Sequence, residues 1–232
     1  MKKFLIFFCS VLLVFGMVGV AAADPIPVAN STFNDLPGSG PLGWTPGAPA
    51  SWGIIGNGGV FNSVNIYEPP QLYTGHDASD VALLYSDGAT LGQWLAASPA
   101  DGMTYTLSVQ AAGRIGLTGT GVTYALAFIA GDPGNLLNWI PLGTSGTFTP
   151  TEGAFNTVQF AYTYTAADYD PIYSVLGIIL VVSGASDYNQ VLFDNVSVDG
   201  STAAAVPEPA TMFLLGSGLI GIGVFARKRF RK

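Results

Sequence analysis

The segment Thr104-Tyr105-Thr106-Leu107-Ser108-Val109-Gln110-Ala111 decides the fold class, because its apolar and polar side chains alternate. The apolar residues at 105, 107 and 109 fall on one face and the hydroxyl residues at 104, 106 and 108 on the other. This two-residue period is typical of a half-buried β-strand. Residues 157–164 repeat the pattern.

The neighbouring segments extend the same interpretation in both directions. Residues 122–130 and 174–182 are longer apolar runs, and residues 190–198 close the region. Towards the N-terminus the chain is rich in Gly, Pro, Asn and Ser, with short strands expected at 52–55, 59–64, 81–85 and 91–96. No segment has a convincing helical period, so we predict an all-β domain, an antiparallel β-sandwich, over residues 24–199.

Charge is distributed unevenly along the chain. Between residues 24 and 199 there is one basic residue, Arg114, against 14 acidic ones, a formal charge of −13 compared with −7 for the whole chain. Such a domain cannot neutralise phosphates, which excludes nucleic-acid binding. It should attract divalent cations instead. The only cysteine, Cys9, lies in the N-terminal apolar run, which excludes disulfides and cysteine chemistry once that run is removed.

The N-terminus has the features of a signal peptide. Two lysines precede an apolar run over residues 4–20, and small residues follow at Ala21 and Ala23. This pattern predicts export and cleavage by signal peptidase after Ala23, so that residues 1–23 are lost. An uncleaved N-terminal anchor is the alternative.

The C-terminus has the features of a short membrane anchor. Residues 200–205 form a linker of small residues, and residues 210–226 are uncharged and mostly apolar. As a helix this 17-residue run would extend about 25 Å, near the lower limit for a transmembrane helix. The basic end should stay on the cytoplasmic side, which places the central domain outside the inner membrane. Its basic residues are Arg227, Lys228, Arg229, Arg231 and Lys232.

Directly before this apolar run stands Val206-Pro207-Glu208-Pro209. Together with the helix and the basic end, residues 206–232 resemble the PEP-CTERM sorting signal of Gram-negative bacteria that make extracellular polysaccharide. The resemblance implies a temporary inner-membrane anchor, recognition by an exosortase-type membrane protease, and cleavage near Pro207–Pro209. The product would pass to the cell surface or the extracellular matrix. The prolines should hold the segment extended and accessible.

A second resemblance concerns the central domain. Asn30-Ser31-Thr32-Phe33-Asn34, Gly43-Trp44, residues 104–109 and Leu192-Phe193-Asp194-Asn195-Val196 are similar to galactose-binding-like jelly rolls, which include many carbohydrate-binding modules. In that fold the first and last strands are neighbours, which would bring Asn34 near Asp194. The resemblance implies a structural calcium ion there, although Asn34 replaces an acidic ligand. The alternative for Asp194 is a strand-end carboxylate bonded to nearby backbone.

Catalytic constellations are weakly supported by the sequence. His76 is the only histidine, and its segment with Asp77 and Asp80 is predicted to be a solvated turn rather than a metal site or a base. No serine lies in a Gly-x-Ser-x-Gly motif, so a Ser–His–Asp triad is unsupported. Glu68 and Glu152 are the domain's only glutamates, and both fall in expected loops.

Aromatic residues in or beside loops are the candidates for stacking on sugar rings. These are Trp52, Trp139, Tyr67 and Tyr73, while Trp44 and Trp94 are expected in the core. Structural packing is the competing interpretation for all of them. The sequence therefore predicts a non-enzymatic exported surface or matrix protein, with exopolysaccharide as the candidate ligand and calcium as the only candidate cofactor. A secreted polysaccharide hydrolase and a purely structural surface protein are the alternatives.

Overall fold

A computed structural model describes residues 23–34, 44–62, 73–75, 80–117, 119–132, 138–168 and 173–202. The chain divides into two units, one of residues Ala22–Ser201 and one of Met1–Ala21 with Thr202–Lys232. The first unit contains the strands discussed below. The signal peptide, the sorting motif, the transmembrane helix and the basic end predicted above lie outside the described residues. In the part that is described, no helix has the length and apolarity needed to cross a membrane.

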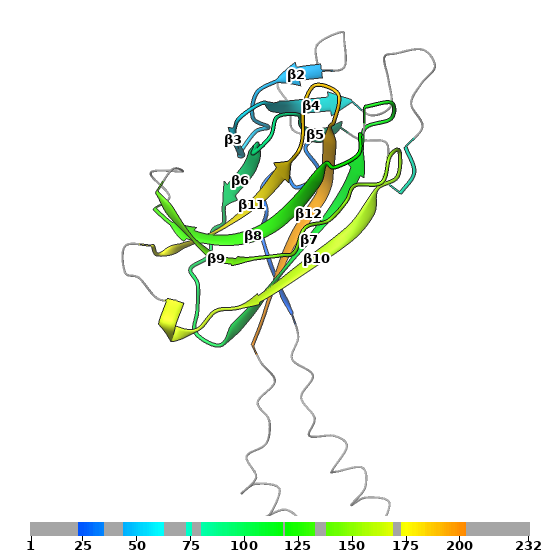
Figure 1. Ribbon diagram of the computed structural model, residues 1–232. Helices are drawn as coiled ribbons and strands as arrows, with labels where there is room; N and C mark the ends of the chain where they lie inside the picture. Colours follow the sequence, from blue (N-terminus) through cyan, green and yellow to red (C-terminus); the bar gives the residue numbers. More distant parts are fainter. Residues whose placement is uncertain are drawn as a thin grey trace, which may run out of the picture. The chain divides into compact units, whose positions relative to one another are not determined.

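The first unit is built from two antiparallel sheets (Figure 1), which confirms the predicted all-β sandwich. The seven-stranded sheet has the order β10-β7-β12-β5-β4-β2, and β1 also pairs with β12. Its strands are β1 (Asp24–Ile26), β2 (Trp44–Pro46), β4 (Gly58–Asn62), β5 (Asp80–Leu84), β7 (Met103–Gly113), β10 (Asn156–Thr163) and β12 (Val191–Thr202).

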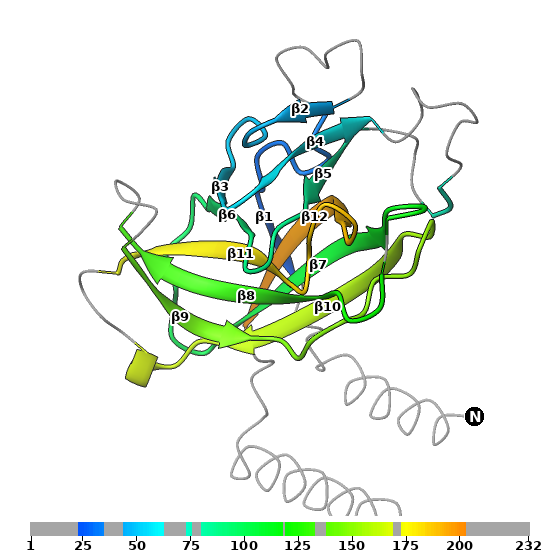
Figure 2. The ribbon, with the colours of Figure 1, turned by 45° about the horizontal axis from the view of Figure 1, so that its top comes forward.

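The five-stranded sheet has the order β3-β6-β11-β8-β9. In Figure 2, β8 runs between β11 and β9 across this layer. Its strands are β3 (Gly53–Ile55), β6 (Thr90–Trp94), β8 (Thr123–Gly131), β9 (Trp139–Thr144) and β11 (Val175–Ser183). The one helical element among the described residues is the 3₁₀ turn Ala166–Asp168.

The main core lies between the two sheets. The alternation of the segment that opens β7 is confirmed, because Tyr105, Leu107 and Val109 are buried there and the residues between them are half-buried. Phe128 of β8 meets Tyr105 from the opposite sheet, with ring centroids 6.0 Å apart. Each fully buried side chain of this kind contributes about 1.5–3 kcal/mol from burial alone. The packing of β7 against the other sheet therefore fixes the sandwich.

The last strand, β12, contains a bulge that the sequence pattern conceals. Its core residues are Val191 and Phe193, then Val196 and Val198, so the alternation shifts by one residue in between. Asn195 has a left-handed backbone with φ of 47°, a conformation that asparagine tolerates better than most residues. The extra residue is a bulge, which re-aims the neighbouring side chains.

The first strand pairs with the last. Asp24 lies opposite Gly200 in the antiparallel register of β1 and β12. The first residue after the predicted cleavage site therefore lies beside the end of the sandwich, as the jelly-roll resemblance implied. The predicted boundary between the domain and the linker, at residues 199 and 200, needs correction. β12 continues to Thr202 and so includes the start of the predicted linker.

Candidate functional site

The outer face of the five-stranded sheet carries two tryptophans over a floor of glycines. In the strand pairing, Gly177 lies opposite Trp94, Gly92 opposite Ile179, and Gly131 opposite Trp139. A Cβ atom at Gly177 or Gly131 would collide with the Trp94 ring. The indole of Trp94 therefore lies across β11 and β8, in space that only glycine leaves open.

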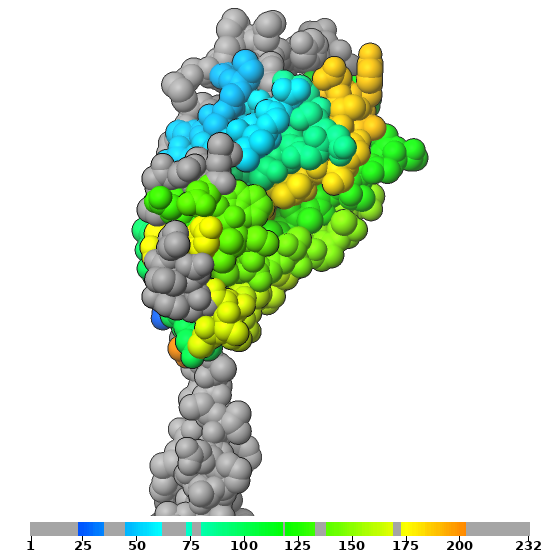
Figure 3. Space-filling model, turned by 60° about the vertical axis from the view of Figure 1, so that its left-hand side comes forward, coloured from blue at the N-terminus to red at the C-terminus, as the bar shows by residue number. Residues whose placement is uncertain are grey.

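A shallow pocket of about 140 Å³ opens beside these residues. Figure 3 views the first unit from the side on which β3 and β9 lie. Ile55 is 47% exposed, which leaves its side chain available for contact with a ligand. The lining residues are Gly53, Ile54, Ile55, Thr90, Gly92, Gln93, Ile129, Trp139 and Ile179.

The polar groups of this pocket are few, and the main one is already engaged. Gln93 accepts a hydrogen bond from the Ala29 N–H at 2.8 Å and donates to the carbonyl oxygens of Ala29 and Ser51. It thereby joins the segment that follows β1 to the segment that precedes β3. Thr90 is the other polar lining residue, and none of the lining side chains ionises near neutral pH. The described lining of the pocket is therefore mostly apolar, with Gln93 and Thr90 as its polar side chains.

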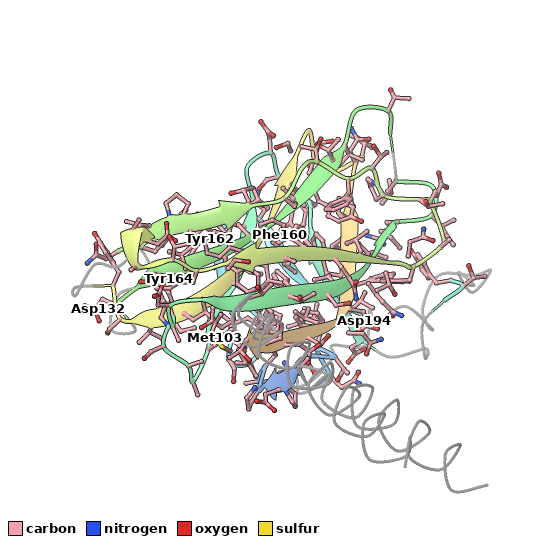
Figure 4. All side chains as sticks on the ribbon, turned by 90° about the horizontal axis from the view of Figure 1, so that it is seen from below. Met103, Asp132, Phe160, Tyr162, Tyr164 and Asp194 are labelled. Carbon is pink, nitrogen blue, oxygen red and sulfur yellow. The ribbon has the colours of Figure 1, made fainter. Side chains whose placement is uncertain are left out.

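A second cluster gathers oxygen ligands at the bulged part of β12. The Val196 N–H donates to the Ser31 carbonyl, and the Asn34 side-chain oxygen accepts from the Asp80 N–H at 3.0 Å. Asp80 opens β5, which pairs with β12 so that Phe193 faces Ala82. Asn34 and Asp80 are thus joined directly. The Asp194 carboxylate, labelled on β12 in Figure 4, accepts a hydrogen bond from the neighbouring Asn195 N–H at 2.7 Å, as the alternative interpretation of this residue expected.

The chemistry of this cluster fits a calcium ion. The Asp194 carboxylate is completely buried, and one oxygen of Asp80 is buried without a hydrogen-bond partner. Burial raises the pKa of Asp80, and a cation at this position would favour its charged form. Oxygen-only ligands of this kind are those that calcium prefers. Asn34, Asp80 and Asp194 would hold the ion, and it would bind the turn before β2 to the last strand.

Comparison with known proteins identifies the central domain. Residues 24–199 match the family model described as HpiC1-like, HpiC1 cyclase. The chain belongs to the HpiC1-like family. Residues 205–229 match the PEP-CTERM protein-sorting motif, which confirms the sorting signal that the sequence predicted. No curated protein matches the chain significantly.

Solved structures share the fold of the HpiC1-like domain. A Stig cyclase, Fisc, from Fischerella sp. TAU in complex with (3Z)-3-(1-methyl-2-pyrrolidinylidene)-3H-indole is 22% identical, with a TM-score of 0.59 over 78% of this chain and 100% of that chain. A Fischerella cyclase with 4-(1H-indol-3-yl)butan-2-one is 23% identical, with a TM-score of 0.57 over 78% and 99%. The CBM22-1 xylan-binding domain of Paenibacillus barcinonensis Xyn10C is 13% identical, with a TM-score of 0.48 over 80% and 100%.

The four aromatic residues predicted to stack on sugar rings differ in where they lie in the HpiC1-like domain. Trp139 is half-buried and lines the pocket. Trp52 needs correction, because it is only 6% exposed, packs on Phe33 and donates its indole N–H to two backbone carbonyls. Tyr73 lies with the apolar cluster of the seven-stranded sheet, where its hydroxyl accepts a hydrogen bond from the Ile115 N–H. Tyr67 lies outside the described residues.

Sequence reasoning misplaced Trp94 and Asp80. Trp94 is half-buried on the outer face rather than in the main core, and its indole N–H is buried without a hydrogen-bond partner. Glycines on the same face of three strands, Gly92, Gly131 and Gly177, were the available signal for a flat outer face. Asp80 begins β5 and does not belong to a solvated turn.

Of the residues weighed for catalysis, the structure describes Glu152 and Asp80. His76, Asp77 and Glu68 lie outside the described residues. Glu152 is exposed, and its carboxylate accepts a hydrogen bond from the Gly116 N–H. No group of three or more His, Cys, Asp or Glu side chains comes together within the described ranges.

Calcium should stabilise the protein through Asp80 and Asp194. At a calcium concentration 100 times the dissociation constant, the expected gain is about 2.7 kcal/mol. Asp80→Asn should fold without calcium, because it removes a charge whose burial is unfavourable, yet it should lose the calcium response. Thermal unfolding with calcium or a chelator measures both effects. Asp101→Asn, at an exposed turn, is the control and should respond like the wild type; an unchanged wild-type melting temperature would exclude the site.

Proposed function

We propose that this protein is an exported, exosortase-sorted binding protein whose HpiC1-like domain holds a polysaccharide chain against the outer face of its five-stranded sheet. The observation that supports this most is the apolar pocket beside Trp139, which contains an exposed isoleucine and no ionisable side chain. The PEP-CTERM motif directs such a protein to the cell envelope or beyond it.

The size of the pocket favours contact with one face of a large ligand. Pockets that enclose a whole small molecule usually have volumes of about 300–1,000 Å³. A volume of about 140 Å³ is well below this range. The face of a sugar ring that carries C–H bonds can lie on an indole and an apolar floor, and the rest of the polymer can remain in solvent.

The charge of the domain favours a neutral polysaccharide. With one arginine against 14 acidic residues between positions 24 and 199, the domain repels polymers rich in carboxylates. That arginine, Arg114, lies over the ring of Phe61 at 4.4 Å and donates to Gln190 at 2.7 Å, so its position is structural. A neutral chain meets no such barrier at the pocket.

Family membership favours a second candidate, an enzyme acting on an indole compound. Two solved Fischerella cyclase structures contain indole ligands, and an indole is also flat and apolar. A cyclase must move protons, however, and the described lining of this pocket offers no group suited to that task. We therefore favour the non-enzymatic role.

Replacing Trp139 by alanine should weaken polysaccharide binding about tenfold, equivalent to about 1.4 kcal/mol. The measurement is calorimetry of the secreted protein with neutral polysaccharides such as xylan, β-glucan and galactan, with alginate as the acidic comparison. Tyr188→Ala removes a 78% exposed aromatic ring elsewhere and should bind normally. Equal affinity of Trp139→Ala and wild type, or turnover of an indole compound without polysaccharide binding, would contradict the proposal.

A further inference from the structure

β3 is a short edge strand, and it forms one wall of the pocket. Its three residues, Gly53–Ile55, pair with β6 at the edge of the five-stranded sheet (Figure 2). All three line the pocket, and Ile55 contributes its exposed side chain. A strand of three residues forms few hydrogen bonds with its neighbour, so the position of this wall depends on how the preceding segment is held.

The segment before β3 has an unfavourable backbone conformation. Ser51 has a φ of 68°, in the left-handed region that residues other than glycine rarely adopt. The next residue, Trp52, donates its backbone N–H to the Pro49 carbonyl at 3.0 Å, which closes a tight turn. Such a conformation persists only where surrounding contacts hold it in place.

Gln93 provides such contacts from the neighbouring strand. Its side chain is 4% exposed, and its Nε2 donates to the Ser51 carbonyl at 3.0 Å and to the Ala29 carbonyl at 2.9 Å. Its Oε1 accepts a hydrogen bond from the Ala29 N–H at 2.8 Å. Only this orientation of the amide fits, because a rotated amide would set its oxygen against two carbonyl oxygens. The amide therefore joins β6 to the turn that leads into β3.

Trp52 strengthens the same junction from the other side. Its indole N–H is shared between the carbonyl oxygens of Ala29, at 3.1 Å, and Asn30, at 3.2 Å. The Ala29 carbonyl thus accepts hydrogen bonds from both Trp52 and Gln93. Gln93 is the member of this junction that lies beside the pocket floor, since it follows Gly92 on β6 and both residues line the pocket.

We propose that Gln93 is a positioning residue of the polysaccharide site, whose amide fixes β3 against β6 and thereby keeps Ile55 at the wall of the pocket. This inference rests on the proposed function. Gln93 acts through β3, because both N–H donors of its amide are used within the protein. The ligand meets a wall that is already in place, which lowers the entropic cost of binding.

Replacing Gln93 by glutamate isolates this role, because the two side chains have the same shape. The variant keeps the oxygen that accepts from Ala29 and exchanges the donating NH₂ group for a second oxygen. A protonated carboxyl can still donate one hydrogen bond to a carbonyl, whereas the carbonyl oxygens repel an ionised one. The described hydrogen-bond partners of Gln93 are uncharged backbone groups. Burial should therefore raise the pKa of the introduced carboxyl above its usual value of about 4.3.

Calorimetry with xylan, β-glucan and galactan tests the effect on binding. The protonated carboxyl is the form that holds β3, so the affinity of Gln93→Glu should fall as pH rises through the raised pKa. It should match the wild type near pH 5 and be about tenfold weaker near pH 8, while the wild type binds equally at both. Gln159→Glu adds the same charge at an exposed position of β10 and should bind like the wild type. A folded Gln93→Glu variant with equal affinity at the two pH values overturns the positioning role.

Hydrogen exchange tests the position of β3 without a ligand. Near pH 8 the amides of residues 53–55 in Gln93→Glu should exchange about tenfold faster than in the wild type at the same pH, and those of β7 at the wild-type rate. Near pH 5 the difference should disappear. Unchanged exchange of β3 near pH 8 contradicts the inference even where the wild type binds polysaccharide. A wild type that binds no polysaccharide refutes the proposed function, and the exchange rates still decide whether Gln93 holds β3.

Discussion

Changing Pro207, Glu208 and Pro209 to alanine is expected to leave the exported protein uncleaved and in the membrane fraction. These residues form the core of the PEP-CTERM motif, so a membrane protease that reads the motif should no longer recognise the chain. Loss of the two prolines also removes the extended backbone that a protease needs. Cell fractionation and mass spectrometry of the C-terminus would measure the outcome.

The matched control for the sorting variant changes residues just before the motif. Ser201→Ala with Thr202→Ala alters the end of β12 and leaves the motif intact. This variant should be processed and released like the wild type. Unchanged processing of the triple-alanine variant would show that the motif does not direct cleavage.

Replacing Trp52 by alanine should cost about 3–5 kcal/mol of unfolding free energy, a large part of the 5–15 kcal/mol typical of a domain. The ring fills space against Phe33, with centroids 5.2 Å apart, and its N–H is bonded to the Ala29 and Asn30 carbonyls. Truncation leaves both a cavity and less satisfied backbone oxygens. Urea unfolding followed by circular dichroism gives the free energy.

Trp139→Ala provides the comparison for Trp52. Because Trp139 is half-buried on the outer face, its loss should change the unfolding free energy much less than the loss of Trp52. Equal destabilisation by the two substitutions would show that Trp139 is a core residue and would remove the main support for the binding face.

The strands that the sequence predicted well are those with one face in the core. β7 and β10 alternate because each contributes one row of side chains to the interior and another to the surface. The bulge in β12 could not be predicted from sequence. Apolar residues stand at both odd and even positions between Val191 and Val198, so the pattern does not show that the core-facing positions shift by one residue at Asn195. β9 was missed because Pro141 and Gly143 break its pattern.

The candidate sites were only partly accessible from sequence. Trp139 was predicted as a sugar-stacking residue because it lies beside an expected loop, and in the structure its side chain lines the pocket. Trp94 and Asp80 were assigned to the core and to a solvated turn because local sequence does not show which face of a sheet a residue occupies. Their roles depend on pairing across strands that are far apart in the chain: Trp94 with Gly177, and Asp80 with the turn that ends at Asn34.

The indole N–H signals of the secreted protein in a ¹⁵N–¹H NMR spectrum test the central claim most directly. The signals are assigned with single Trp→Phe variants and followed while a neutral oligosaccharide is added. The account predicts that the signal of Trp139 moves with ligand concentration, that Trp94 follows because it lies on the same face, and that Trp52 stays fixed. Movement of Trp52 with Trp139 unchanged would contradict the binding face described above.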